Sequence, residues 1–128
     1  MKKLKTLFIM ILLTWLALPV FAQEAKWIEM ENFHAVMSIT FHPAEEDNLE
    51  PVKKNAAELL SRAKAWQKAD APAGYNGTAT QPVLKQLVKQ CKLINAAVKK
   101  NNKSDAELKI MITRAHDIFH EIKEKCRK

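Results

Sequence analysis

The four histidines of this chain fall in two stretches that lie far apart in the sequence. His34 and His42 come early, whereas His116 and His120 lie near the end, four residues apart in Ala-His-Asp-Ile-Phe-His. Residues spaced i and i+4 share one face of an α-helix, so this pair can chelate a single ion. Histidine is the commonest protein ligand of metals. The pattern predicts a metal or cofactor site, provided that the fold brings the two stretches together.

The elements that must position these side chains are predicted to be helices. Beyond residue 22, apolar residues recur at three- and four-residue steps, and both glycines lie in one connection. We expect four helices with approximate bounds. The first runs from Ala25 to His42, before Pro43, and the second from Leu49–Pro51 to Lys68. The third runs from Pro82 to Val98, and the fourth from a Ser104–Glu107 capping box to Cys126. Such a pattern is typical of an all-α, up-down-up-down antiparallel four-helix bundle.

In that bundle the first helix lies antiparallel to the last. The start of one then meets the end of the other, which places His34 level with His120 and Met37 level with His116. His34 also falls in the apolar stripe of the first helix, between Met30 and Met37. We therefore expect His34 and His120 to converge between the two helices.

The first 22 residues have the pattern of a bacterial signal peptide. Lys2, Lys3 and Lys5 precede the apolar run Leu7–Leu18, and Val20-Phe21-Ala22 supplies a cleavage site. The run is too short for a good transmembrane span. We expect cleavage to leave residues 23–128 as one domain, located in the periplasm or secreted.

Charge and motifs exclude several classes of function. Without the three signal-peptide lysines, the net charge falls from +7 to +4, and the basic residues are dispersed along three helices with no arginine-rich stripe. Nucleic-acid binding is therefore not expected, although a weak preference for acidic partners or membrane surfaces stays open. No phosphate loop, activated nucleophile or core pair of carboxylates is present, so the sequence does not predict an enzyme.

The two cysteines are predicted to be buried thiols. If the last two helices form a hairpin near Asn102, Cys91 and Cys126 lie about thirteen residues out of register, or nearly 20 Å. A disulfide needs Cα atoms within about 7 Å, so the two do not pair within one molecule. Cys126 lies near the C-terminus, where it could bind a metal or link two copies, and both a monomer and a homodimer stay open.

The chain resembles the periplasmic four-helix cytochromes, the soluble b-type cytochrome and cytochrome c-prime, in length, in its export signal and in the placement of candidate ligands. Met30 is the eighth residue after the cleavage site, and the segment 113–120 is similar to the closing segment of the b-type member. The resemblance implies haem b ligation by Met30 and His120, with His34 as a substitute for Met30. No Cys-x-x-Cys-His motif occurs, so covalent c-type attachment is excluded.

The same residues also suit a transition metal. His34, His116, His120 and His42, with methionine, cysteine or carboxylate neighbours, would fit copper, zinc, nickel or iron. We therefore predict an exported haem- or metal-binding bundle that carries electrons or metal and serves a redox or metal-exchange partner. The alternative is a periplasmic helical interaction protein without a cofactor, in which the histidines and methionines are surface and core residues.

Overall fold

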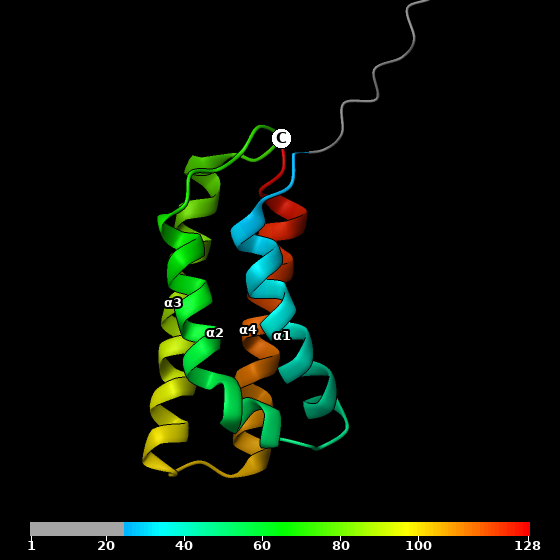
Figure 1. Ribbon diagram of the computed structural model, residues 1–128, viewed down its shortest axis with the longest axis vertical. Coiled ribbons are helices and arrows are strands. Elements are labelled where there is room, and N and C mark those ends of the chain that lie inside the picture. The colour runs from blue at the N-terminus through cyan, green and yellow to red at the C-terminus, as the bar shows by residue number, and fades with distance from the viewer. Residues whose placement is uncertain (1–24) are drawn as a thin grey trace, which may run out of the picture.

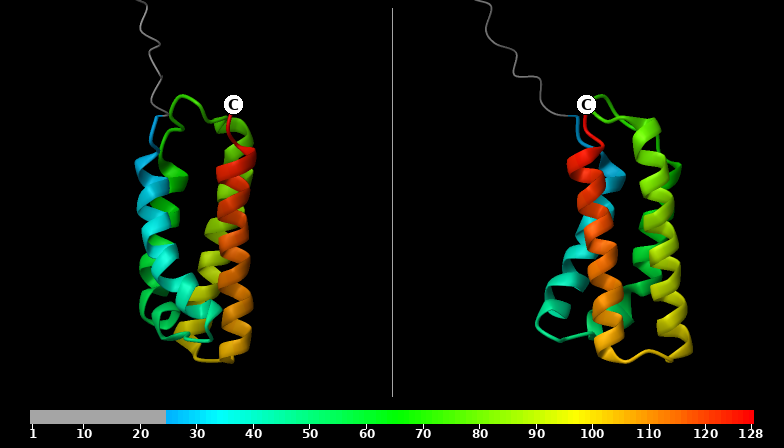
Figure 2. Two further views of the ribbon diagram at one scale, coloured as in Figure 1. Left: turned by 90° about the vertical axis from the view of Figure 1, so that its right-hand side faces the viewer. Right: turned by 180° about the vertical axis from the view of Figure 1, so that it is seen from behind.

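The computed structural model describes residues 25–128, and the expected signal peptide lies outside them. The described chain forms α1 (Ile28–Glu45), α2 (Glu50–Lys68), α3 (Gly77–Lys100) and α4 (Asp105–Lys125). Within residues 25–128 there is no strand beyond one isolated bridge between Tyr75 and Arg127, which confirms the all-α fold class. Each helix packs against the next, and α4 packs against α1, so the four helices close a ring (Figures 1 and 2).

The core is a continuous layer of apolar side chains with aromatic rings at one end. Trp66 of α2 lies 5.6 Å from both Trp27 and Phe33, and Phe33 lies 5.9 Å from Phe119 of α4, measured between ring centroids. All four side chains are at least 98% buried. Burying one such ring contributes roughly 1.5–3 kcal/mol, so this cluster is a main contact between α1, α2 and α4.

The capping box predicted for the last helix is confirmed. The Ser104 hydroxyl accepts a hydrogen bond from the Glu107 amide at 3.2 Å, and the Glu107 carboxylate accepts one from the Ser104 amide at 2.8 Å. Two amides that have no partner inside the helix are thereby satisfied.

The predicted end of the first helix is wrong by one turn. Helix α1 continues through Pro43 to Glu45. Pro43 cannot donate to the carbonyl oxygen of Ile39, so the preceding turn loses one hydrogen bond, and the helix ends two residues later. The carbonyl oxygens of Pro43 and Ala44 accept hydrogen bonds from the amides of residues 46–48, and Asp47 takes a left-handed φ of 64° to make this turn.

The predicted start of the third helix is also wrong. Helix α3 begins at Gly77, five residues before Pro82. The Asn76 side chain accepts a hydrogen bond from the Ala79 amide at 3.1 Å, and the Thr80 hydroxyl donates to the Asn76 carbonyl oxygen at 2.7 Å. This cap stabilises a first turn that looks like a loop in the sequence, and it shortens the long connection expected there.

Both cysteines are free and buried, as expected. Burial raises the pKa of the Cys91 thiol to about 12, so it stays protonated at neutral pH. Among residues 25–128, no helix is both long and apolar enough to cross a membrane.

Candidate metal centre

The strongest constellation is the pair of histidines on α4. The Nε2 atoms of His116 and His120 lie 3.1 Å apart and form a hydrogen bond, in which one ring donates its Nε2–H and the other accepts. Metal–imidazole bonds are about 2.0–2.1 Å long. For an ion bound to both nitrogens at their present separation, the N–metal–N angle would therefore be roughly 95–102°. This angle lies between the values for square or octahedral and for tetrahedral coordination. Two nitrogens at this separation could share one ion if the donor ring moved its proton to Nδ1 and both lone pairs turned toward the ion.

Neighbouring side chains hold both imidazole rings in place. The His116 ring stacks on Phe41 of α1 with centroids 3.7 Å apart and planes 10° apart. The Nδ1 atom of His120 lies 3.5 Å from Glu124 Oε1. A carboxylate beside Nδ1 favours the His120 tautomer with its proton on that nitrogen, so His120 Nε2 accepts the hydrogen bond from His116 Nε2–H. His116 must then move its own proton to Nδ1 before both Nε2 atoms can bind one metal ion.

His116 is half-buried, and burial lowers its pKa, with a further decrease from the neighbouring His120. Both effects disfavour the protonated ring, because burial and a like charge each destabilise the cation. His116 is therefore held in the neutral form, which is the form that binds metals.

His34 lies beside this pair, although not where the sequence placed it. Its expected position at the centre of the apolar stripe is wrong, because Phe33 and Thr40 fill the core and His34 is half-buried at the edge. The ring stacks on Phe119 with centroids 4.9 Å apart. Since Phe119 lies 5.4 Å from the His120 ring, the rings of His34 and His120 are at most about 10 Å apart. Burial, and then the charge of Lys123, lower the pKa of His34.

His42 lies at the other side of the pair and is mostly exposed. Its Nδ1 contacts Glu45 Oε2 at 3.1 Å, and 67% of its side chain is accessible. Phe41 lies 5.7 Å from the His42 ring and 3.7 Å from the His116 ring, so these two imidazoles are within about 9 Å. The four histidines thus line the contact between α1 and α4, which we call the histidine seam (the face toward the viewer in the left view of Figure 2).

Only two of these side chains form a ready-made donor set. Within residues 25–128, no group of three or more histidine, cysteine, aspartate or glutamate residues is arranged to hold a metal ion. His34 and His42 lie close enough to approach the pair, but His34 is stacked on Phe119 and His42 is paired with Glu45. An ion bound to this pair would therefore have two nitrogen ligands from the protein, and its remaining coordination positions would fall to water or to another molecule.

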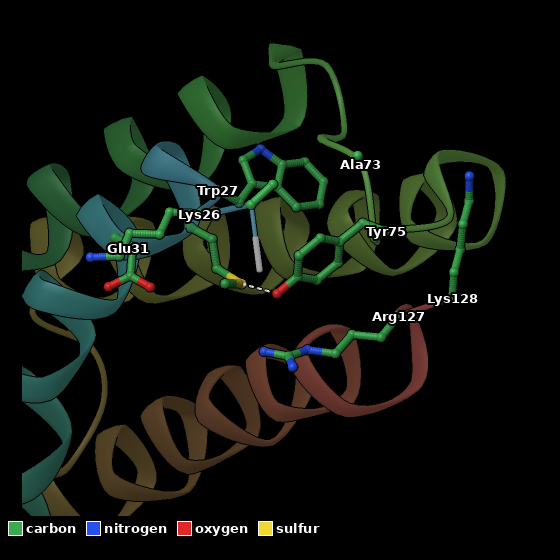
Figure 3. Close-up of a pocket in the computed structure, with 10 residues that line it drawn as sticks. Lys26, Trp27, Glu31, Ala73, Tyr75, Arg127 and Lys128 are labelled. Carbon is green, nitrogen blue, oxygen red and sulfur yellow. Dashed lines mark hydrogen bonds between the residues drawn. The ribbon is translucent and has the colours of Figure 1, made fainter. Parts of the chain in front are cut away.

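Met30 lies away from the histidine pair. Its sulfur accepts a hydrogen bond from the Tyr75 hydroxyl at 3.7 Å, and Tyr75 lies between Trp27 and Arg127 at one end of the molecule (Figure 3). The His120 Nε2 atom instead faces His116. Both candidate haem ligands are thus engaged by other side chains, and the aromatic rings of Trp27, Phe33, Trp66 and Phe119 are buried in the interior. Ligation of haem b stays a prediction that these contacts do not favour.

Three residues of the centre were not singled out from the sequence. Glu124 follows His120 by four residues, so its position at the Nδ1 atom could have been inferred from helical spacing. The stacking partners Phe41 and Phe119 have the pattern of ordinary core residues, and nothing in their spacing distinguishes them.

Comparisons of the chain with models of known protein families, with curated proteins and with solved structures find no match.

Proposed function

We propose that this protein is an exported metal carrier that binds a divalent transition-metal ion through the Nε2 atoms of His116 and His120. It would act in the periplasm or outside a bacterial cell after loss of residues 1–22, as an up-down-up-down antiparallel bundle. The observation that carries this function is the 3.1 Å separation of two imidazole nitrogens whose rings are fixed by Phe41 and Glu124.

The donor set indicates which ions would bind. Imidazole nitrogen suits copper(II), nickel(II), zinc(II) and iron(II), and the affinity of such sites generally increases through iron and nickel to copper and then falls at zinc. Soft ligands that would select copper(I) are absent from the pair, and the Cys91 thiol is buried with its pKa raised to about 12. We therefore expect copper(II) to bind most tightly, followed by nickel(II) and zinc(II).

A carrier role fits an incomplete and accessible coordination shell. Structural zinc sites usually provide four protein ligands, whereas this pair supplies two, and the side chain of His120 is 42% exposed. A partner protein can reach the open positions and take the ion by ligand exchange. An electron carrier would instead need a redox centre that keeps its ligands through each cycle.

Isothermal titration with copper(II), nickel(II) and zinc(II) tests this assignment. The variants His116→Asn and His120→Asn should each weaken binding at least as much as loss of an outer-shell partner does, roughly 10–100-fold. Arg114→Asn is the matched control, because it introduces the same residue at an exposed position of the same helix.

Two results would contradict metal binding at this pair. Equal affinities in the wild type and in the His116, His120 and Arg114 variants would mean that the ion binds elsewhere. A wild-type chain that binds none of the ions would favour the alternative function, an interaction protein without a cofactor. A Soret band after addition of haem, lost in His120→Asn and Met30→Leu, would instead support the cytochrome resemblance.

A further inference from the structure

Five lysines gather on one exposed side of α3. Lys85, Lys89, Lys92, Lys99 and Lys100 are all exposed, and at 100° per residue they fall within an arc of about 100°. They span about 22 Å along the axis at 1.5 Å per residue. We call these five residues the lysine face. Five of the basic residues that looked dispersed along the sequence thus share one helix surface.

No acidic side chain balances this face. Neither aspartate nor glutamate occurs between Ala71 and Ser104, and within residues 25–128 none of the five lysines forms an ion pair. Helix α1 has the opposite composition, with three glutamates and no lysine or arginine. In the ring of helices α1 lies diagonally across from α3 (Figures 1 and 2). Helix α3 thus carries lysines without acidic residues, whereas α1 carries glutamates without lysine or arginine.

We infer that the lysine face docks the protein on an anionic phospholipid surface. Each lysine near such a surface adds roughly a fivefold gain in partitioning, and five of them on a straight helix can reach a plane together. Leu93, which is 50% exposed, lies at the edge of the arc and offers an apolar side chain to the headgroup layer. The inference does not depend on metal binding.

The composition of the face favours lipid over an acidic protein. Specific protein interfaces are enriched in tyrosine, tryptophan and arginine and depleted in lysine. The lysine face has none of the three enriched types, and from Ala71 to Ser104 there is no arginine at all. Electrostatic attraction to an anionic membrane surface, by contrast, needs only accessible cationic side chains on the protein. Docking through α3 would leave the diagonally placed α1 turned away from the membrane.

Co-sedimentation of the full chain with vesicles tests the inference. The protein should bind vesicles of one-third phosphatidylglycerol in phosphatidylcholine, bind pure phosphatidylcholine far less, and dissociate as salt is raised. The double variant Lys89→Gln/Lys92→Gln should lower the partition coefficient roughly 30-fold. Lys54→Gln/Lys125→Gln is the matched control, because it removes the same charge from exposed positions on α2 and α4 and should change binding by less than about threefold.

Residues 1–24 are the same in every variant, so their contribution to vesicle binding is absent from the ratio of two partition coefficients. An equal loss in both double variants would mean that net charge alone attracts the protein, and would overturn a docking face on α3. Absence of vesicle binding would overturn the inference as well. If polyglutamate then bound through Lys89 and Lys92, the face would belong to an acidic protein partner.

Discussion

At the scale of single residues, the carboxylate next to His120 is expected to tune the metal pair. Glu124→Gln should weaken metal binding about tenfold, at the lower end of the outer-shell range, because the carboxylate is 70% exposed and lies 3.5 Å from Nδ1. Competition titration against a chromophoric chelator would measure the change. Glu121→Gln is the same substitution about one turn from Glu124, and it should leave the affinity for the metal unchanged. An equal loss of affinity in this variant would mean that the negative charge acts on the metal regardless of its contact with Nδ1.

A second expectation at this scale concerns pH and the free energy of unfolding. Burial lowers the pKa of both His34 and His116 in the folded state below the value of 6.5 in the unfolded chain. Below about pH 6.5 the unfolded state therefore binds more protons, so stability is complete above this pH and falls as the pH decreases toward the folded-state values. Lys123, His120 and His42 reinforce the effect, whereas the carboxylates of Glu31, Glu45 and Asp117 oppose it.

Urea denaturation of the metal-free protein between pH 5 and pH 7.5, in the presence of a chelator, would measure this slope. The double variant His34→Gln/His116→Gln should flatten it, since both titrating groups are removed. His42→Gln should flatten it much less, because His42 lowers the pKa of both rings by less than burial does. A wild-type profile without any loss of stability at low pH would contradict the expectation.

The sequence could predict the pair but not the full centre. The spacing of His116 and His120 implies a shared helix face, and their 3.1 Å contact follows from that spacing once the rotamers agree. The lateral placement of His34 could not be predicted, because apolar periodicity does not show whether Phe33 or His34 points inward. The stacking of His116 on Phe41 depends on the rotation of α1 against α4, which is a tertiary property.

At the scale of the helices, the Ser104 cap is expected to contribute measurably to stability. Ser104→Ala removes the acceptor for the Glu107 amide and should lower the free energy of unfolding by about 1 kcal/mol. Ser61→Ala is the matched control, because Ser61 is exposed inside α2, where alanine is the better helix former. Chemical denaturation would compare the two, and an equal decrease in both would show that the capping bond has no special weight.

Helix identity was predictable, but three helix ends were not: α1 begins three residues after Ala25 and ends three after His42, and α3 begins five before Pro82. All four helices have apolar residues at helical spacing in the sequence, and this spacing predicts the all-α class and the central part of each helix. The ends depend on local hydrogen bonds that compete with the tendencies of proline and glycine. Pro43 lies in a last turn whose carbonyl oxygens find other donors, and Asn76 caps a turn that begins with glycine.

At the scale of the whole molecule, closure of the ring joins the two ends of the described chain. Helix α1 meets α4 through Phe41 on His116 and His34 on Phe119, so the aromatic core and the histidine seam share residues. Phe119 contacts Phe33 on one side and His34 on the other. A change in the packing of α1 against α4 is therefore expected to reach the metal pair directly.

This connection predicts that metal binding stabilises the fold. An ion present at 100 times its dissociation constant should raise the free energy of unfolding by about 2.7 kcal/mol if it binds only the folded state. For a domain of this size that corresponds to an increase in Tm of roughly 10 °C. Both ligands lie on α4, so an unfolded chain keeps some affinity and the observed shift should be smaller.

Differential scanning fluorimetry with and without zinc(II) would measure the increase. Phe41→Leu preserves an apolar side chain but removes the ring that fixes His116, so it should reduce the zinc-dependent shift in Tm. The double variant His116→Asn/His120→Asn should abolish it. A shift that survives in that double variant would mean that zinc stabilises the protein through other groups, whereas a full shift in Phe41→Leu would show that α1 has no part in preparing the pair for the ion.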